Sequence, residues 1–171
     1  KMLLVSSPDP WLQKVVQPFD FDNLDAKLIS GQMAKIMLAK NGIGLSANQV
    51  GLDAQIFVQR PLEHKEITKP FAVINPKILE LDEDTELGKE GCLSHIGLVL
   101  NIRRSKRLVA QFLDIEGKEC IIEFNGIDAR CFLHEFDHLN GIEFIDRVSR
   151  LKLEMAKKKQ KKLMQEFKNN G

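Results

Sequence analysis

The run His134-Glu135-Phe136-Asp137-His138 constrains this chain more tightly than any other segment. Two histidines four residues apart on a helix project from one face and can bind a single metal ion. Glu135 lies about one turn before His138, close enough to a bound metal to move protons without being a ligand. The segment therefore predicts a helix that supports metal-assisted hydrolysis.

The flanking residues indicate that this helix is buried and runs from about Gly126 to Asn140. Its inward stripe follows i, i+4, i+7, i+11 spacing and consists of Ile127, Cys131, His134 and His138. Gly141 supplies a C-terminal stop. The alternative is that both are ordinary core histidines. That alternative does not explain why two histidines lie on the same helix face with an acidic residue between them.

A catalytic tetrahedral centre needs a third protein ligand and one open position. Downstream of the helix only Glu143 and Glu154 could be the third ligand, and both are poorly placed because they come after the helix stop at Gly141. Cys92 is the better candidate, since it lies in Glu-Gly-Cys-Leu-Ser, where Gly91 allows close approach of the backbone to a ligand.

The other two cysteines have simpler interpretations. Cys120 falls in an alternating stretch and is expected to be a half-buried strand residue, while Cys131 is expected to line the pocket rather than bind the metal. Three cysteines, an odd number, fit a reducing compartment better than a disulfide framework.

A glycine-rich segment from 42 to 51 carries a third signal. It has neither the spacing of a dinucleotide loop nor the Lys-Ser/Thr of a P-loop, so its simplest interpretation is a helix stop and a turn into a strand. That interpretation leaves Gln49 unexplained, a neutral hydrogen-bond donor placed just after a run of small residues.

Together, and in this order, the three segments resemble the G-x-G-L-x-A-x-Q, E-G-C-L-S and H-E-x-x-H motifs of the peptide deformylases. The similarity runs from Pro8 to about Asp146. The resemblance implies that the metal ligands are Cys92, His134 and His138. It implies that Glu135 is the general acid/base, and that Gln49 and the backbone N–H of Leu93 stabilise the oxyanion. The residues expected at the substrate are Ile43, Gly44, Gly91, Arg130 and Cys131.

The activity implied by this resemblance is hydrolysis of the formyl group, as formate, from N-formylmethionyl nascent peptides. A Cys/His/His set alone favours zinc, with iron, cobalt and nickel as alternatives. The resemblance instead implies Fe(II) in the cell, with zinc, nickel or cobalt as substitutes in a purified sample.

Two other functions share parts of the pattern. An H-E-x-x-H metallopeptidase would use a third His or Glu and would have no role for Cys92. A non-catalytic ribosome-associated domain with structural zinc would fill all four positions with Cys or His, whereas only three convincing ligands are present.

Several positions depart from the usual pattern of the family, among them Ser46 and Leu133. His95-Ile96-Gly97 follows the Cys92 motif where a proline is usual, and Glu143 stands where an apolar residue is frequent. We expect His95 to be a groove or surface residue rather than a fourth ligand. We also expect His64, in a polar loop, to be exposed.

The fold class expected is α+β, a single domain over residues 1–171 in which antiparallel strands surround the metal-binding helix and a C-terminal helix follows. An earlier helix is expected from about Leu24 to Lys40, with the inward residues Leu28, Ile29, Met33, Ile36 and Met37. Strands are expected at Gln55–Gln59, Phe71–Ile74 and Lys77–Leu81, and at Leu108–Ile115 and Lys118–Phe124, which form a hairpin about Glu116-Gly117.

The net charge of +1 gives no global basic field. The exception is a lysine-rich stretch, 157–162, in a helix expected from about 149 to 167, with an interrupted apolar side of Leu151, Met155, Leu163 and Met164. It is either a solvated face or, by resemblance, a ribosome contact, and we expect its removal to spare turnover. No segment approaches transmembrane length. We expect a monomer in the cytoplasm of a bacterium or of a virus-infected bacterial cell, with an organelle as the alternative.

Overall fold

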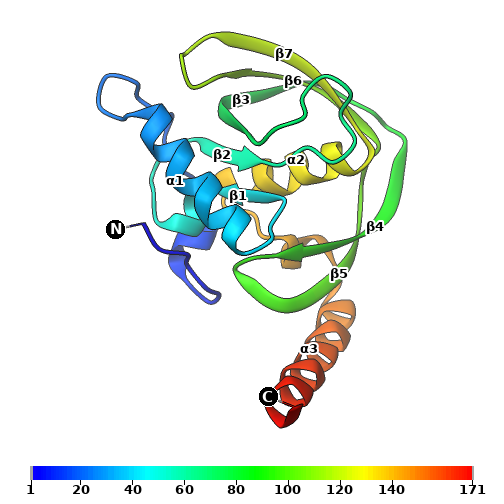
Figure 1. The fold of residues 1–171 in the computed structure, drawn as a ribbon. Helices are drawn as coiled ribbons and strands as arrows, with labels where there is room; N and C mark the ends of the chain where they lie inside the picture. Colours follow the sequence, from blue (N-terminus) through cyan, green and yellow to red (C-terminus); the bar gives the residue numbers. More distant parts are fainter. Residues whose placement is uncertain (1, 171) are drawn as a thin grey trace.

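Residues 2–170, which the computed structural model describes, fold as two antiparallel sheets around a central helix (Figure 1). The helices are α1 (Ala26–Ala39), α2 (Gly126–Leu139) and α3 (Arg150–Asn170), with the 3-10 turns η1 (Pro10–Gln13), η2 (Ala47–Val50) and η3 (Phe144–Arg147). The strands are β1 (Gly44–Ser46), β2 (Ile56–Gln59), β3 (Phe71–Leu81), β4 (Thr85–Cys92), β5 (His95–Ser105), β6 (Arg107–Leu113) and β7 (Glu119–Asn125). The expected α+β class is confirmed.

The larger sheet has the order β1-β2-β3-β6-β7. The expected β6–β7 hairpin is present, and Gly117 at its turn takes a positive φ of 78° that favours glycine. The two strands expected between Phe71 and Leu81 are one strand, β3. A register shift between Ile74 and Lys77, around Pro76, takes up the irregularity without ending the strand.

The second sheet is the long hairpin β4–β5, which the sequence did not predict. Its inward face carries Glu90 and Arg104 among apolar residues, so the usual alternation of apolar and polar residues is broken. The two strands meet in the two-residue turn Leu93–Ser94, and Cys92 pairs with His95 across it. This turn brings the Cys92 motif to the edge of α2.

Helix α2 is buried along most of its length and contacts strands of both sheets. It ends at Leu139, and Gly141 follows with a positive φ of 72°, so the expected stop is confirmed. A side chain at Gly141 would also meet the Gln13 carbonyl oxygen at 2.6 Å. The expected inward stripe holds except at Ile127, which is 38% exposed in the first turn.

Helix α1 begins after the N-cap Asp25, whose side chain accepts a hydrogen bond from the Leu28 N–H at 3.0 Å. Met33 and Met37 are fully buried, as expected. The inward placement expected for Leu28 is wrong, because this side chain in the first turn is 57% exposed.

Helix α3 extends away from the body of the protein (Figure 1) and has no buried residue. The apolar residues expected on one side are exposed, Leu151 by 67% and Leu163 by 55%. Leu153 and Ala156 pack against a small core under β5, and Gln160 donates a hydrogen bond to the Ile96 carbonyl at 2.7 Å. Along residues 2–170, every helix is too short or too polar to cross a bilayer.

Candidate metal centre and active site

Three expected ligands meet where β4 ends beside α2. The donor atoms of Cys92, His134 and His138 lie within 4.8 Å of one another, and Cys92 Sγ is 3.5 Å from His138 Nε2. Both histidines are buried, because the i, i+4 spacing turns them inward together. Residues 42 positions apart in the chain, Cys92 and His134, thus share one site.

The surroundings of these donors fit a metal ion. His134 Nδ1 is held 2.8 Å from Glu90 Oε1, which directs its Nε2 into the site. Burial lowers the pKa of His138 well below its usual value, which favours the neutral ring that a metal ion binds. Three S and N donors leave an open position, as catalytic centres require.

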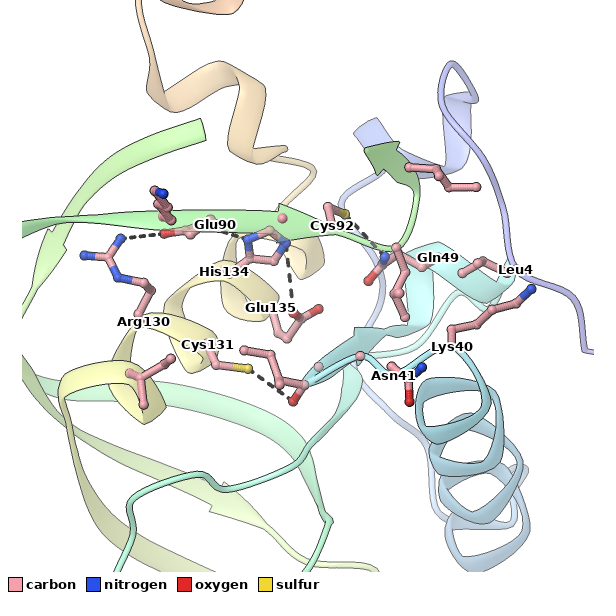
Figure 2. Close-up of a pocket in the computed structure, with 18 of the residues that line it drawn as sticks. Leu4, Lys40, Asn41, Gln49, Glu90, Cys92, Arg130, Cys131, His134 and Glu135 are labelled. Atoms are coloured by element: carbon pink, nitrogen blue, oxygen red, sulfur yellow. Dashed lines mark hydrogen bonds and ion pairs between the residues drawn. The ribbon is translucent and has the colours of Figure 1, made fainter. Parts of the chain in front are cut away.

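Glu135 lies beside the ligands without belonging to them. Its Oε2 is 4.0 Å from His134 Nε2, and Figure 2 shows both side chains directed into the same cavity. Burial raises the pKa of Glu135 to about 7. Its Oε1 is buried and has no hydrogen-bond partner among the described residues, so the site is built to hold a polar ligand here.

Glu90 anchors the ligand set to the hairpin. Burial alone would raise its pKa, but hydrogen bonds from Arg104 and His134 outweigh that effect and lower the pKa to about 2. Arg104 binds both carboxylate oxygens of Glu90, at 2.8 and 2.9 Å, and donates to Asp137 on α2 at 2.6 Å. This buried network holds β4–β5 against α2. Sequence reasoning missed it, and charged residues inside an otherwise alternating strand were the available signal.

The amide orientation of Gln49 follows from its acceptor contacts. Its Oε1 accepts hydrogen bonds from the Ser46 N–H at 3.0 Å and from Ser46 Oγ at 3.2 Å. Its NH2 group therefore faces the opposite side, toward Cys92 Sγ at 3.5 Å and Ser94 Oγ at 3.1 Å. Gln49 is thus a buried donor beside the turn that carries Leu93.

Gly44 makes room for the Glu135 carboxylate. A Cβ at this position would lie 2.6 Å from Glu135 Oε2 and 2.9 Å from Cys131 Sγ, both closer than van der Waals contact. A Cβ at Gly42 would similarly meet Leu93 Cδ1 at 2.7 Å. The glycine-rich segment therefore serves close packing of the loop against the site.

A cavity of about 520 Å³ opens over these groups (Figure 2). Ten of the eleven expected site residues line it, namely Ile43, Gly44, Gln49, Gly91, Cys92, Leu93, Arg130, Cys131, His134 and Glu135. His138, the eleventh, is fully buried behind the cavity. Cys131 lines the wall, and its Sγ donates to the Ile43 carbonyl at 3.3 Å. The sequence identified a set of residues that the fold brings together.

Two expectations about neighbouring residues need correction. His95 is buried, not at the surface, and its Nε2 lies 2.7 Å from Glu143 Oε1. Glu143 is buried as well. His64 is only partly exposed, because its ring packs on Phe124 and its Nδ1 accepts two backbone N–H bonds. A polar residue type does not reveal a partner far away in the chain.

A buried Cys/His/His set with an open position and an adjacent carboxylate defines a metal-dependent hydrolase. Comparison with known proteins is more specific. The family model described as Polypeptide deformylase matches residues 2–154. The chain is 35% identical over 153 residues to the peptide deformylase of Rhizobium meliloti, covering 90% of this chain and 88% of the relative. It is 40% identical over 151 residues to the peptide deformylase of Thermotoga maritima, covering 88% of this chain and 89% of that relative.

A solved structure agrees with these sequence matches. The crystal structure of peptide deformylase from Ehrlichia chaffeensis superposes with a TM-score of 0.84 at 36% identity, over 96% of this chain and 97% of that one. The chain therefore belongs to the polypeptide deformylase family, enzymes that remove the formyl group from the N-terminus of nascent peptides. This placement decides against the metallopeptidase and the non-catalytic ribosomal domain.

Proposed function

We propose that Cys92, His134 and His138 hold one Fe(II) ion and that Glu135, Gln49 and Leu93 complete the deformylation site. The convergence of the three donors next to a buried carboxylate is the observation that carries this assignment. When bound, the cation supplies Lewis-acid activation of the attacking water.

Glu135 is the proposed proton carrier. A carboxyl whose pKa lies near 7 exchanges a proton readily at neutral pH in either direction. Glu135 lines the cavity in which water would attack the formyl carbon, and its buried Oε1 has no hydrogen-bond partner among the described residues. Glu135 would take the proton from that water and deliver it to the departing amine, so that formate and a free N-terminal methionine result.

Gln49 and the Leu93 N–H are the proposed oxyanion donors. Attack on the formyl carbon places negative charge on the former carbonyl oxygen, and preorganised donors stabilise that charge. The acceptor contacts of Gln49 Oε1 hold its NH2 group beside Cys92 before substrate arrives. Leu93 lies directly after Cys92, which makes its N–H the nearest donor along the chain.

The formylmethionyl peptide is proposed to lie between the β4 edge at Gly91 and the loop at Ile43 and Gly44, with Cys131 in the wall. Arg130 is a different case. Its NH1 donates to Glu90 and to the Ile102 carbonyl, and its NH2 to the Glu86 carbonyl. We therefore propose that Arg130 supports β4 from behind rather than binding substrate.

The test is formate release from formyl-Met-Ala, with metal content measured in the same samples. Cys92→Ser should lose metal and activity together, since it removes a thiolate ligand. A Cys92→Ser protein that keeps full metal occupancy and turnover would refute the ligand set. Cys120→Ser, a half-buried cysteine on β7, is the matched control and should leave both unchanged.

The choice of Fe(II) is tested by loading metal-free protein anaerobically with iron, nickel, cobalt or zinc. We expect iron to give high turnover that is lost in air, since a thiolate-bound ferrous site is open to oxidation. Nickel or cobalt protein should survive air. Zinc protein with the highest turnover would overturn the proposal.

We further propose that the lysines of α3 contact ribosomal RNA, and that the enzyme acts as a monomer in the bacterial cytoplasm, where its relatives' substrates arise. The lysines at 157, 158, 159, 161 and 162 extend over about two turns of a helix that projects from the body. Ribosome affinity should fall steeply with salt and should be lost in Lys158→Glu/Lys161→Glu/Lys162→Glu. If charge reversal leaves the affinity for ribosomes unchanged, these lysines only form a solvated face of the helix. A dimer in sedimentation would refute the monomer.

A further inference from the structure

His95 and Glu143 form a buried polar pair that the reaction does not use. Their side chains are 7% and 4% exposed, and His95 Nε2 lies 2.7 Å from Glu143 Oε1. An ionised carboxylate only accepts hydrogen bonds, so His95 Nε2 carries the proton of this bond. The Glu143 backbone is fixed at the start of η3, because its N–H donates to Asp146 Oδ2 at 2.9 Å and its carbonyl accepts the Asp146 N–H at 3.0 Å. The buried His95–Glu143 bond is hard to break, because either side chain would then be left unpaired.

The pair joins the two parts of the chain that carry the ligands. His95 is the Cα partner of Cys92 across the Leu93–Ser94 turn, and residues opposite each other in an antiparallel ladder direct their side chains to the same face. Glu143 lies five residues beyond His138, just after the stop at Gly141. The bond therefore ties the Cys92 turn to the segment that leaves α2.

A stack of rings makes a second connection. The His95 ring packs on Phe144 with centroids 5.3 Å apart, and Phe144 packs on His134 with centroids 5.5 Å apart. Phe144 is almost fully buried, so this contact leaves little free space. A displacement of His95 would therefore reach a metal ligand through Phe144 as well as through the turn.

Strand pairing alone does not fix Cys92. The β4–β5 register shifts between Glu90 and Cys92, so the ladder is irregular just before the ligand. Other contacts must then set the place of the turn, and the Ser94 contacts with Gln49 and Ser7 hold only its tip. Glu90 and Arg104 hold the strands behind the turn, and His95 ties the turn itself to the segment that follows α2.

We propose that the His95–Glu143 pair is a positioning brace that sets the separation of the Cys92 thiolate from His134 and His138, and thereby the affinity of the centre for its metal. This goes beyond the proposed reaction but rests on the proposed ligand role of Cys92. A stabilising role alone is the competing explanation. Buried ion pairs are often no better for stability than apolar pairs of equal volume, so stability and metal affinity must be measured separately.

The test uses Co(II), which reports on its ligands by visible absorption. Single variants His95→Leu and Glu143→Leu each break the bond, and both should bind Co(II) roughly 10-fold more weakly, the lower end for outer partners of metal ligands. Their cobalt absorption should shift, because the thiolate geometry changes. His95→Gln, whose amide can still reach Glu143, should stay close to wild type.

The double variant His95→Leu/Glu143→Leu separates a coupled pair from two independent residues. If the pair acts as a unit, the double variant binds Co(II) no more weakly than the single variant with the lower Co(II) affinity. Losses that multiply to about 100-fold would overturn the proposal, since they would be the product of two independent effects of roughly 10-fold. So would single variants that unfold at lower temperature but keep wild-type cobalt affinity and spectrum.

Two controls keep the outcomes apart. Arg107→Leu removes two solvent-accessible ion pairs, with Glu80 and Glu123, in the five-stranded sheet. It should leave the cobalt centre unchanged. Cys92→Ser tests the ligand assignment itself. If it keeps full affinity, the ligand set fails. If it loses cobalt while the single variants of the pair keep wild-type binding, only the brace fails.

Discussion

The sharpest test of the active-site packing is Gly44→Ala. The new Cβ would lie 2.6 Å from Glu135 Oε2. Nonbonded contact is comfortable at about 3.5 Å, so the carboxylate or the loop must move by roughly 0.9 Å. A misplacement of about 1 Å at a reacting group costs about 10²-fold. We therefore expect kcat for formyl-Met-Ala to fall about 100-fold, while metal content and fold stay intact because no ligand is touched.

The assay is steady-state formate release, with metal content and thermal unfolding measured on the same protein. Gly31→Ala is the matched control, since a Cβ at this exposed position in α1 meets nothing within 4 Å. It should keep full turnover and gain up to ~1 kcal/mol of helix stability. A Gly44→Ala enzyme with normal kcat, or with only a raised KM, would refute the argument that this glycine makes room for Glu135.

Further changes address the other parts of the site. Glu135→Gln should keep its metal but lower kcat by ~10²- to 10⁴-fold, and near-native turnover at full occupancy would contradict its proton-carrying role. Gln49→Leu should lower kcat by ~10²- to 10³-fold with metal bound normally, whereas a pure KM effect would make it a ground-state binding residue. Glu90→Gln should cost ~3–5 kcal/mol in urea unfolding, because Arg104 and Arg130 both lose the buried charge of Glu90, and unchanged stability would contradict the network. Deleting residues after Arg150 should lower the thermal midpoint and cobalt affinity, and a truncated protein as stable as the full chain would refute this.

The structure leads to a different expectation for the truncation than the linear order of the sequence does. The linear order places every expected site residue before α3, which predicts that its removal spares turnover. In the structure Leu153 and Ala156 cover a core formed by Leu98, Leu100, Ile102 and Phe144, against which Cys92 also packs. The first turns of α3 therefore support the strand next to the proposed ligand Cys92, and farther along the helix Gln160 donates a hydrogen bond to the Ile96 carbonyl at 2.7 Å.

Features with a local signal were predicted well. Helix α2 was expected from about 126 to 140 and runs from Gly126 to Leu139. It could be predicted because helical periodicity and a glycine stop are both local features of the sequence. The β6–β7 hairpin was found for the same reason, through its alternation and its glycine turn. The donor set was identifiable because metal chemistry accepts few residue types.

The sequence by itself determined which residues are the proposed donors, since His134, Glu135 and His138 need only a helix to share one face, and the Cys92 motif offers the remaining proposed donor. Tertiary structure alone decided which charged residues are inside. Glu90 is buried because Arg104 neutralises it, and His95 is buried with Glu143, 48 positions away, as its hydrogen-bond partner. No local pattern carries this information, because the cost of burying a polar side chain depends on a partner that only the folded chain brings into contact.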